Sequence, residues 1–274
     1  MYDKIGGTMN TKNDLKVVIL CGGQGTRLRE ETEFKPKPMV DVGGHPMLWH
    51  IMKIYSHYGF RDFVLCLGYK GEIIRQYFLD QELMSRDITI NPYKGKRTLH
   101  DKISEIEDWN ITLANTGQNT MTGSRLKGIE KYLNSDEFML TYGDGVSDID
   151  INALLEKHKK NKTIATLTGV NPQSRFGMIK SDEHEVVTEF VEKATIYDDY
   201  VNGGFYVFKK DILDYLSSDE TCTLEKEPLI RLAKERQLSV YKNKGFWHCM
   251  DTYRDYLNLN EIWASGKVPW RVWE

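Results

Sequence analysis

Residues 16–28 read KVVILCGGQGTRL, an apolar run that passes directly into a glycine-rich loop. The β-branched segment Lys16–Cys21, bounded by polar residues and glycine, is typical of a buried strand in a parallel sheet. Gly22, Gly23 and Gly25 let the backbone turn tightly and approach a ligand closely. Backbone amides exposed by such a loop attract phosphate. The stretch therefore predicts an α/β fold with an anion-binding loop after its first strand.

Strand and helix patterns alternate along the rest of the chain. Met47–Tyr58 and Gly71–Leu79 have apolar residues at helical spacing, and Phe63–Gly68 between them is a second apolar strand. The alternation continues with strands at Asn110–Ala114, Glu137–Tyr142, Thr163–Val170 and Leu238–Asn243 and with helices at Gly123–Leu133, Ile151–Lys159, Glu225–Arg236 and Thr252–Ala264. This order predicts a Rossmann-like, mostly parallel sheet flanked by helices. Short strands between Gly177 and Phe208 predict a small antiparallel addition.

The length of 274 residues suits one large domain. We expect residues 15–274 to form that domain. The polar residues 1–14 are expected to be a disordered extension, in which Met9 could be an alternative start. The polar, poorly periodic segment Arg86–Glu107 is either a mobile loop or an arm used in assembly. Trp263, Trp270 and Trp273 near the C-terminus are expected to pack on the domain or on a neighbouring subunit.

The composition excludes several partners. With 37 Lys+Arg against 40 Asp+Glu the net charge is −3, which argues against nucleic acid or an anionic membrane as the main partner. No apolar run approaches the ~20 residues that a membrane span needs, and the N-terminus lacks a secretion signal. The four cysteines form no Cys-x-x-Cys pair, so reduced thiols in a cytoplasmic protein are expected.

Two cations follow the glycine loop. Arg27 offers a planar fork for phosphate, and Lys37 is a point charge between prolines that restrict φ. The loop lacks the Gly-Lys-Ser/Thr ending of a Walker motif, and Leu28 stands where a dinucleotide loop needs glycine. A third pattern, Gly-Gly-x-Gly-Thr-Arg-Leu followed by Lys-Pro-Lys-Pro, is fully met by the segment Lys35–Pro38. Two cations beside a phosphate loop suit a nucleoside triphosphate.

Residues 21–52, CGGQGTRLREETEFKPKPMVDVGGHPMLWHIM, resemble the opening of the sugar nucleotidylyltransferases, and specifically of the glucose-1-phosphate cytidylyltransferase branch. The resemblance extends from about Lys16 to Glu274. It includes MTGSRL at Met121–Leu126, YGDGVSDID at Tyr142–Asp150, RFG at Arg175–Gly177, NGGF at Asn202–Phe205, GFWHCMDTYRD at Gly245–Asp255 and WASGKVPWRVWE at the C-terminus. It implies the nucleotide-diphospho-sugar transferase fold, a homo-oligomer, and the substrates CTP and α-D-glucose 1-phosphate, which give CDP-glucose and pyrophosphate.

The resemblance also implies roles for residues at matching positions. Arg27 and Lys37 would act in catalysis, and Asp144 and Asp251 would hold Mg²⁺. The nucleotide would be bound by Leu20, Cys21, Gly22, Gly23, Gln24, Gly25, Thr26, Arg27, Lys37, Thr120, Arg125 and Gly143. The sugar phosphate would be bound by Gly177, Glu192, Lys193, Asn202 and Gly203.

Each role has a structural alternative. Asp144 could be a turn residue, and Asp251 could be a helix cap or an acid in the first turn of a helix. Glu192 and Lys193 could be a surface ion pair, and Ala194 stands where the family commonly has proline. Arg125 could be solvated at a helix start, where the helix dipole disfavours a cation. Asp150 is expected to cap the helix that begins at Ile151.

The implied reaction needs no general base, because the attacking phosphate oxygen is already anionic. Positioning and charge neutralisation should therefore provide the catalysis. Three rivals stay open: the same chemistry with another nucleotide or sugar, as in a thymidylyl- or uridylyltransferase; a non-catalytic regulatory subunit of this family; and a glycosyltransferase. The product resembles a precursor of dideoxysugars in surface polysaccharide, such as the O-antigen of lipopolysaccharide.

Overall fold

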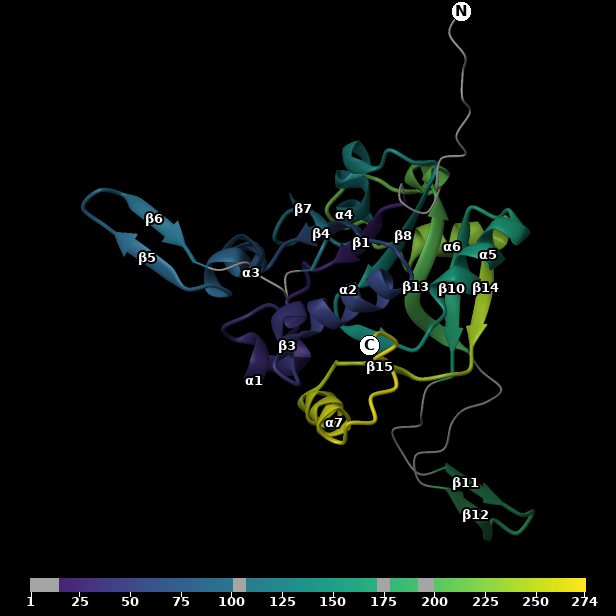
Figure 1. The fold of residues 1–274 in the computed structure, drawn as a ribbon. Coiled ribbons are helices and arrows are strands. Elements are labelled where there is room, and N and C mark those ends of the chain that lie inside the picture. The colour runs from purple at the N-terminus through teal and green to yellow at the C-terminus, as the bar shows by residue number, and fades with distance from the viewer. Residues whose placement is uncertain (1–14, 101–106, 172–177, 192–199) are drawn as a thin grey trace, which may run out of the picture.

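The computed structural model describes residues 15–100, 107–171, 178–191 and 200–274. The predictions for residues 1–14, Gly177, Glu192 and Lys193 lie outside these ranges. A seven-stranded sheet forms the centre of the fold (Figure 1). In spatial order its strands are β14 (Leu238–Asn243), β10 (Ala165–Val170), β13 (Val201–Lys209), β8 (Glu137–Tyr142), β1 (Val17–Leu20), β4 (Asp62–Leu67) and β7 (Asn110–Asn115). Only β13 runs antiparallel to its neighbours within this sheet, which confirms the predicted mixed, mostly parallel sheet.

Helices cover both faces of the sheet. The principal helices are α2 (Met47–His57), α3 (Gly71–Met84), α4 (Thr122–Gly128), α5 (Ile151–Asn161), α6 (Glu227–Lys234) and α7 (Tyr253–Ala264). Val17 and Ile19 of β1 face an apolar cluster that includes residues of α2, α5 and α7. Val18 and Leu20 face a second cluster built with α4 and α6. Alternation of side chains along β1 therefore produces two separate cores.

Short elements complete the chain. They are α1 (Arg29–Thr32), β2 (Asp41–Val42), β3 (His45–Pro46), β5 (Ile88–Asn91), β6 (Lys96–Leu99), β9 (Gly145–Ser147), β11 (Met178–Ser181), β12 (Val187–Val191) and β15 (Trp247–Cys249), with 3-10 helices at Thr26–Leu28, Lys37–Met39, Glu130–Tyr132 and Lys210–Tyr215. Strand β15 pairs with β9 in antiparallel fashion. This pairing brings the segment that follows β15 close to the end of β8.

Several elements differ from the predictions, among them α3, which continues to Met84 beyond the predicted end at Leu79. The helix predicted over Gly123–Leu133 is interrupted, since α4 ends at Gly128 and a 3-10 turn follows. Glycine is a poor helix former, which accounts for the break. Helix α6 begins at Glu227 rather than Glu225, with a proline in its first turn. The antiparallel addition predicted between Gly177 and Phe208 comprises a separate hairpin, β11–β12, and β13 within the main sheet.

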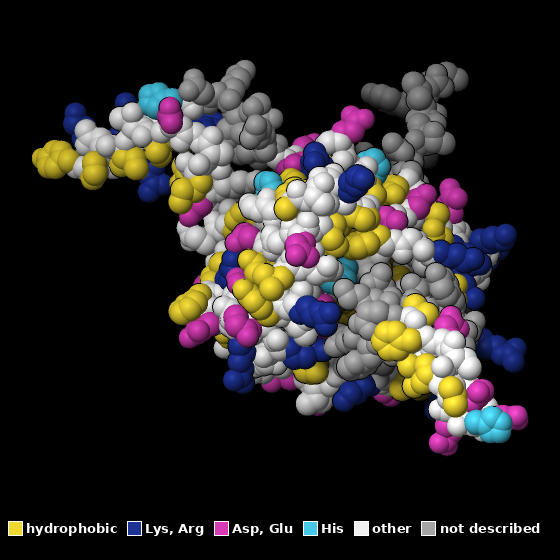
Figure 2. All heavy atoms as spheres, turned by 90° about the horizontal axis from the view of Figure 1, so that it is seen from below, with side chains coloured by type: hydrophobic (Ala, Val, Ile, Leu, Met, Phe, Trp, Pro, Cys, Tyr) yellow, Lys and Arg dark blue, Asp and Glu magenta, His cyan; other side chains and the backbone are white. Residues whose placement is uncertain are grey.

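The segment Arg86–Glu107 contains a two-stranded hairpin, β5–β6, that projects from the body of the molecule (Figure 1). The hairpin β11–β12 also projects from the body, at a place apart from β5–β6 (Figure 1). Both have exposed apolar side chains, including Ile90 and Tyr93 on the first and Ile179 and Phe190 on the second (Figure 2). A two-stranded hairpin is only marginally stable by itself in water. The predicted loop thus has regular structure over residues 88–99, and its use in assembly stays a prediction.

The C-terminal tryptophans pack on the body of the protein around His50. Trp270 is completely buried, and its indole Nε1–H donates to Nδ1 of His50 over 3.4 Å. The other ring nitrogen of His50 lies 2.8 Å from the carbonyl oxygen of Val42. Burial lowers the pKa of His50 to about 4, so the ring is neutral. Trp263 and Trp273 complete the aromatic group. Among the described residues, no helix is both long and apolar enough to cross a bilayer.

Candidate active site

A cavity of about 390 Å³ lies where β1 and β8 end. The carboxyl ends of parallel strands are the usual place for ligands in α/β sheets. The cavity is lined by residues 20–27 of the glycine loop, Lys37, Pro38, residues 118–122, Arg125, residues 142–144 and Asp251. All twelve residues predicted to bind the nucleotide and both predicted metal ligands are among them. The structure therefore brings together side chains from distant parts of the chain around one cavity.

Lys37 joins the two aspartates. It begins the 3-10 helix Lys37–Met39, and its Nζ lies 2.6 Å from Oδ2 of Asp144 and 2.7 Å from Oδ1 of Asp251. Burial by itself would lower the pKa of Lys37, but the charge of Asp144 and hydrogen bonds to both carboxylates outweigh it and raise this pKa above its ordinary value. The ammonium group is thus charged at any physiological pH.

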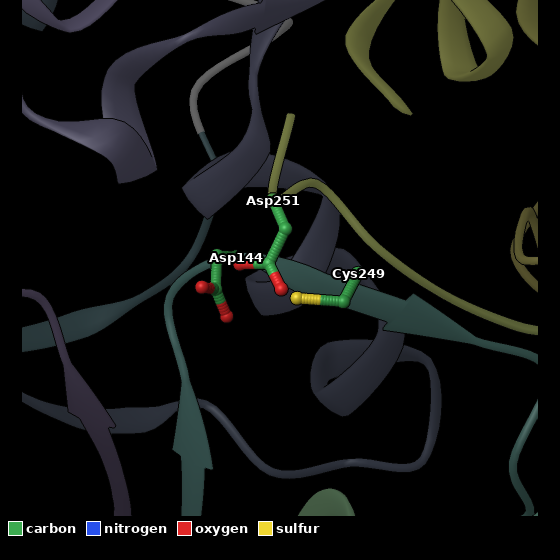
Figure 3. Close-up of side chains that lie close together, drawn as sticks. All are labelled: Asp144, Cys249 and Asp251. Carbon is green, nitrogen blue, oxygen red and sulfur yellow. The ribbon is translucent and has the colours of Figure 1, made fainter. Parts of the chain in front are cut away.

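Asp144, Cys249 and Asp251 converge beside this ammonium group (Figure 3). One ligand atom from each lies within 4.8 Å of the others. Carboxylate oxygens suit Mg²⁺, whereas a thiol does not, so the two aspartates are the fitting donors. The alternative of Asp251 as a helix cap is wrong. Thr252 caps α7 and forms a capping box with Asp255.

The backbone of Asp144 does lie in a turn, as the alternative interpretation expected, but this does not exclude a role for its side chain. Its carbonyl oxygen accepts a hydrogen bond from the backbone N–H of Met250 over 2.8 Å. This bond fixes the Asp251 segment against the end of β8. The predicted cap at Asp150 is confirmed, because its Oδ1 accepts from the N–H of Ala153 over 3.0 Å.

Arg27 stands at the edge of the cavity. Its guanidinium group lies 3.2 Å from Oδ1 of Asp251, and its side chain is 70% exposed. The exposure leaves most of its donors available to an anionic ligand. Gly25, just before it, has φ +62°, the left-handed region that favours glycine. The glycine thereby permits the turn that directs Arg27 to this edge.

Arg125 is buried, which excludes the alternative of a solvated residue. Its guanidinium donates to the carbonyl oxygens of Gly22, Leu67, Gly117 and Gln118 and to the hydroxyl of Thr116. A Cβ on Gly22 would lie 2.2 Å from Cζ of Arg125. Arg125 therefore ties the glycine loop to the segment after β7. Its donors are used within the protein, so it supports the walls of the cavity.

Asn202 and Gly203, predicted to bind the sugar phosphate, lie at the start of β13 and outside the cavity lining. The ring of Tyr142, which lines the cavity, packs against Gly204 beside them, where a Cβ would lie 2.6 Å from it. Asn202 accepts from the N–H of Gly204 over 2.9 Å, and Gly203 accepts from the Trp247 indole over 2.8 Å. The remaining predicted sugar residues are outside the described ranges.

Several residues of the site were not predicted from the sequence. They include Gln118, Asn119, Thr122 and Tyr142 of the lining, and Glu225, which binds two of them. Tyr142 and Thr122 fall inside motifs already quoted, YGDG and MTGSRL, which could have indicated them. No local sequence pattern indicates Glu225, because its partners Thr122 and Tyr142 lie 103 and 83 positions away in the sequence.

Comparison with known proteins agrees with this geometry. Residues 16–265 match the sequence profile of the Nucleotidyl transferase family, and the chain belongs to this family. Within the family it is 46% identical over 261 residues to the glucose-1-phosphate cytidylyltransferase of Salmonella typhi, which covers 95% of this chain and 100% of that one. It is 42% identical over 259 residues to the "probable glucose-1-phosphate cytidylyltransferase" of Bacillus subtilis, with 94% and 100% covered. These matches confirm the resemblance inferred from the motifs.

A solved structure supports the same fold. The crystal structure of HddC from Yersinia pseudotuberculosis superimposes with a TM-score of 0.63 at 24% identity, covering 91% of this chain and 99% of that one. At this identity the similarity is one of fold. It confirms the sheet flanked by helices that the sequence predicts.

Proposed function

We propose that this protein transfers the cytidylyl group of CTP to α-D-glucose 1-phosphate, giving CDP-glucose and pyrophosphate. The observation that carries the proposal is the position of Lys37, whose ammonium group joins Asp144 and Asp251 inside a cavity walled by a glycine loop. The 46% identity to the Salmonella typhi enzyme supports the choice of nucleotide and sugar. Such a cation beside a phosphate loop suits a reaction between two polyanions.

In the reaction an oxygen of the sugar phosphate attacks the α-phosphorus of CTP. A new P–O bond forms, the bond to the β-phosphate oxygen breaks, and pyrophosphate leaves with its electron pair. The attacking oxygen is already anionic, so the residues need to position and neutralise rather than remove a proton. Lys37 and Arg27 are the cations of the described residues that line the cavity with donors for phosphate. Electrostatic stabilisation of this type typically gives factors of about 10²–10³ per donor.

Asp144 and Asp251 are the residues that would hold Mg²⁺. The bound ion would add charge neutralisation at the phosphates, which is the chemistry that Mg²⁺ supplies in nucleotide sites. Their approach to a single ammonium group supports this role, because a position that suits one cation between two carboxylates suits another.

The sugar phosphate is assigned to Gly177, Glu192, Lys193, Asn202 and Gly203. Lys193 binds the phosphate and Glu192 a hydroxyl group. Support for Asn202 and Gly203 comes from β13, whose later residues, from Phe205 on, pair with β8, the strand that ends just before Asp144. The protein is further proposed to be a cytoplasmic homo-oligomer. The apolar side chains on both projecting hairpins support association, and the four free cysteines suit a reducing compartment. Its product would enter the synthesis of surface polysaccharide.

The test is a pyrophosphate-release assay with CTP, UTP, dTTP and GTP, each paired with glucose 1-phosphate. We expect CTP to be preferred and chelation of divalent metal to abolish turnover. Preference for UTP or dTTP would assign a uridylyl- or thymidylyltransferase instead. Release with no pair would favour the regulatory subunit or a glycosyltransferase, whereas pyrophosphate release with any pair would exclude both.

A further inference from the structure

Glu225 lies behind one wall of the cavity and contacts two residues that line it. Its Oε2 accepts a hydrogen bond from the hydroxyl of Thr122 over 2.7 Å, and its Oε1 accepts one from the hydroxyl of Tyr142. Thr122 begins α4 and Tyr142 ends β8, while Glu225 precedes α6. Three elements that are remote in sequence thus meet at one carboxylate.

The carboxylate fixes where the two hydroxyl protons point. An ionised glutamate only accepts hydrogen bonds, so both hydroxyl groups must donate to it. Each hydroxyl oxygen also accepts from elsewhere: Thr122 from the N–H of Leu224 over 2.9 Å, and Tyr142 from the hydroxyl of Tyr206 over 3.0 Å. Neither hydroxyl group retains a proton for a ligand.

Asn202 provides an independent check of this direction. The N–H of Gly204 donates to its Oδ1 over 2.9 Å, which leaves its Nδ2 to donate to the hydroxyl of Tyr206. That hydroxyl therefore passes its own proton to Tyr142. The hydrogen bonds run in one direction, from Asn202 through Tyr206 and Tyr142 to Glu225. The direction required by the donor at Asn202 is the same as that required by the acceptor at Glu225.

We propose that Glu225 is a specificity-determining residue: by holding the hydroxyl protons of Thr122 and Tyr142, it leaves these two hydroxyl groups of the cavity lining able only to accept hydrogen bonds. The pair of hydroxyl groups, called the wall below, then selects a substrate group that has an N–H or O–H donor over one that has a carbonyl oxygen. A site built to pair a donor strongly rejects the analogue that lacks it, because a buried polar group is left unpaired.

The inference rests on the proposed function for the identity of the substrates. Two sources offer the required donor: the exocyclic amino group of cytosine, which is a carbonyl in uracil, and a hydroxyl of a sugar. The chemistry at the wall is the same for both. The substrate pairs used in the experiment distinguish them.

The experiment compares the wild type with Glu225→Gln. A glutamine accepts one hydroxyl proton but donates to the other hydroxyl, which must turn its own proton away from the glutamine. We expect the kcat/KM preference for the donor-bearing substrate to fall about tenfold, the value of one hydrogen bond. The nucleotide arm compares CTP with UTP, and the sugar arm compares glucose 1-phosphate with its monodeoxyfluoro analogues. The arm that changes identifies the source of the donor.

The matched control is Glu235→Gln. Tyr215 donates to Glu235 over 2.6 Å on the protein surface, so this variant makes the same chemical change to a tyrosine–glutamate pair remote from the cavity. We expect both preferences to stay as in the wild type. A folded Glu225→Gln protein with both preferences within about twofold of this control overturns the proposal.

If Glu225→Gln does not fold, two variants that keep the carboxylate, Thr122→Val and Tyr142→Phe, test the proposal instead. Each removes one accepting oxygen, so KM for the donor-bearing substrate should rise about tenfold, and KM for its analogue much less. Equal effects on both substrates overturn the proposal. If the wild type releases no pyrophosphate, the proposed function fails, and calorimetric affinities for CTP and UTP in the same variants test Glu225 separately.

Discussion

Nζ of Lys37 lies 2.6 Å from Oδ2 of Asp144, although 107 positions separate the two residues in the sequence. The same ammonium group lies 2.7 Å from Oδ1 of Asp251. The two carboxylates that share this ammonium group would repel each other without a cation between them. The lysine therefore stabilises the acidic pair.

Lys37→Ala should reduce kcat/KM about a hundredfold or more, because it removes a cation proposed to neutralise the reacting phosphates. It also leaves Asp144 and Asp251 facing each other, so the thermal midpoint should fall modestly. Pyrophosphate release and calorimetry measure the two effects. The control is Lys35→Ala, which breaks a surface pair with Asp41 at 2.6 Å and should change neither quantity much. Near-normal turnover by Lys37→Ala would exclude the proposed role.

Asp144→Asn and Asp251→Asn should each weaken metal binding at least about tenfold, since an amide oxygen has no charge for the ion. Binding of Mn²⁺ followed by electron paramagnetic resonance reports this without an activity assay. Asp150→Asn serves as the control, because asparagine caps a helix as well as aspartate does. Unchanged Mn²⁺ affinity in both site variants would mean that the metal binds elsewhere.

Features with local causes were predictable from the sequence, and those fixed by distant partners were not. The apolar run before the glycine loop predicts β1, and the spacing in Met47–Tyr58 predicts α2, which ends one residue earlier, at His57. The place of β13 inside the main sheet has no local cause, because it depends on pairing with β8 and β10.

In the candidate site, too, features with local causes were predictable and those fixed by distant partners were not. Motifs indicated many of the residues that line the cavity, but they did not indicate which partners each side chain has. Arg125 matched a nucleotide-binding position, yet its donors go to carbonyl oxygens as far away as Gly22, which no periodicity reveals. Glu225 was missed altogether, because its only distinguishing property is the meeting of Thr122 and Tyr142 at its carboxylate.

Gly22→Ala should destabilise the protein by about 2 kcal/mol or more, because the added methyl group displaces the buried guanidinium of Arg125 and breaks its hydrogen bonds. Gly23→Ala is the matched control, since nothing lies within 4 Å of a Cβ at that position. Chemical denaturation of both variants measures the difference. Equal stability of the two would show that Arg125 is not held as described.

Stability should fall as the pH drops below about 6.5, because His50 is buried and neutral. Its pKa is lowered to about 4 by burial, whereas the unfolded chain binds the proton near pH 6.5. Protonation therefore favours the unfolded state, and this residue alone should reduce the free energy of unfolding by about 2 kcal/mol at pH 5. Denaturation at pH 7.5 and 5 measures the change. An NMR titration that gives His50 a pKa near 6.5 would contradict it.

The contact between Lys37 and Asp251 spans 214 positions. On the ribosome, a nascent chain that has emerged through β9 already has its glycine loop, Lys37 and Asp144. It lacks the second carboxylate until Asp251 has been added, and Trp270, which seals the core beside His50, follows later still. A prematurely terminated chain would therefore have the phosphate loop without the second carboxylate that completes the acidic pair. The acidic pair that shares the Lys37 ammonium group therefore cannot form before residue 251 has been added to the chain.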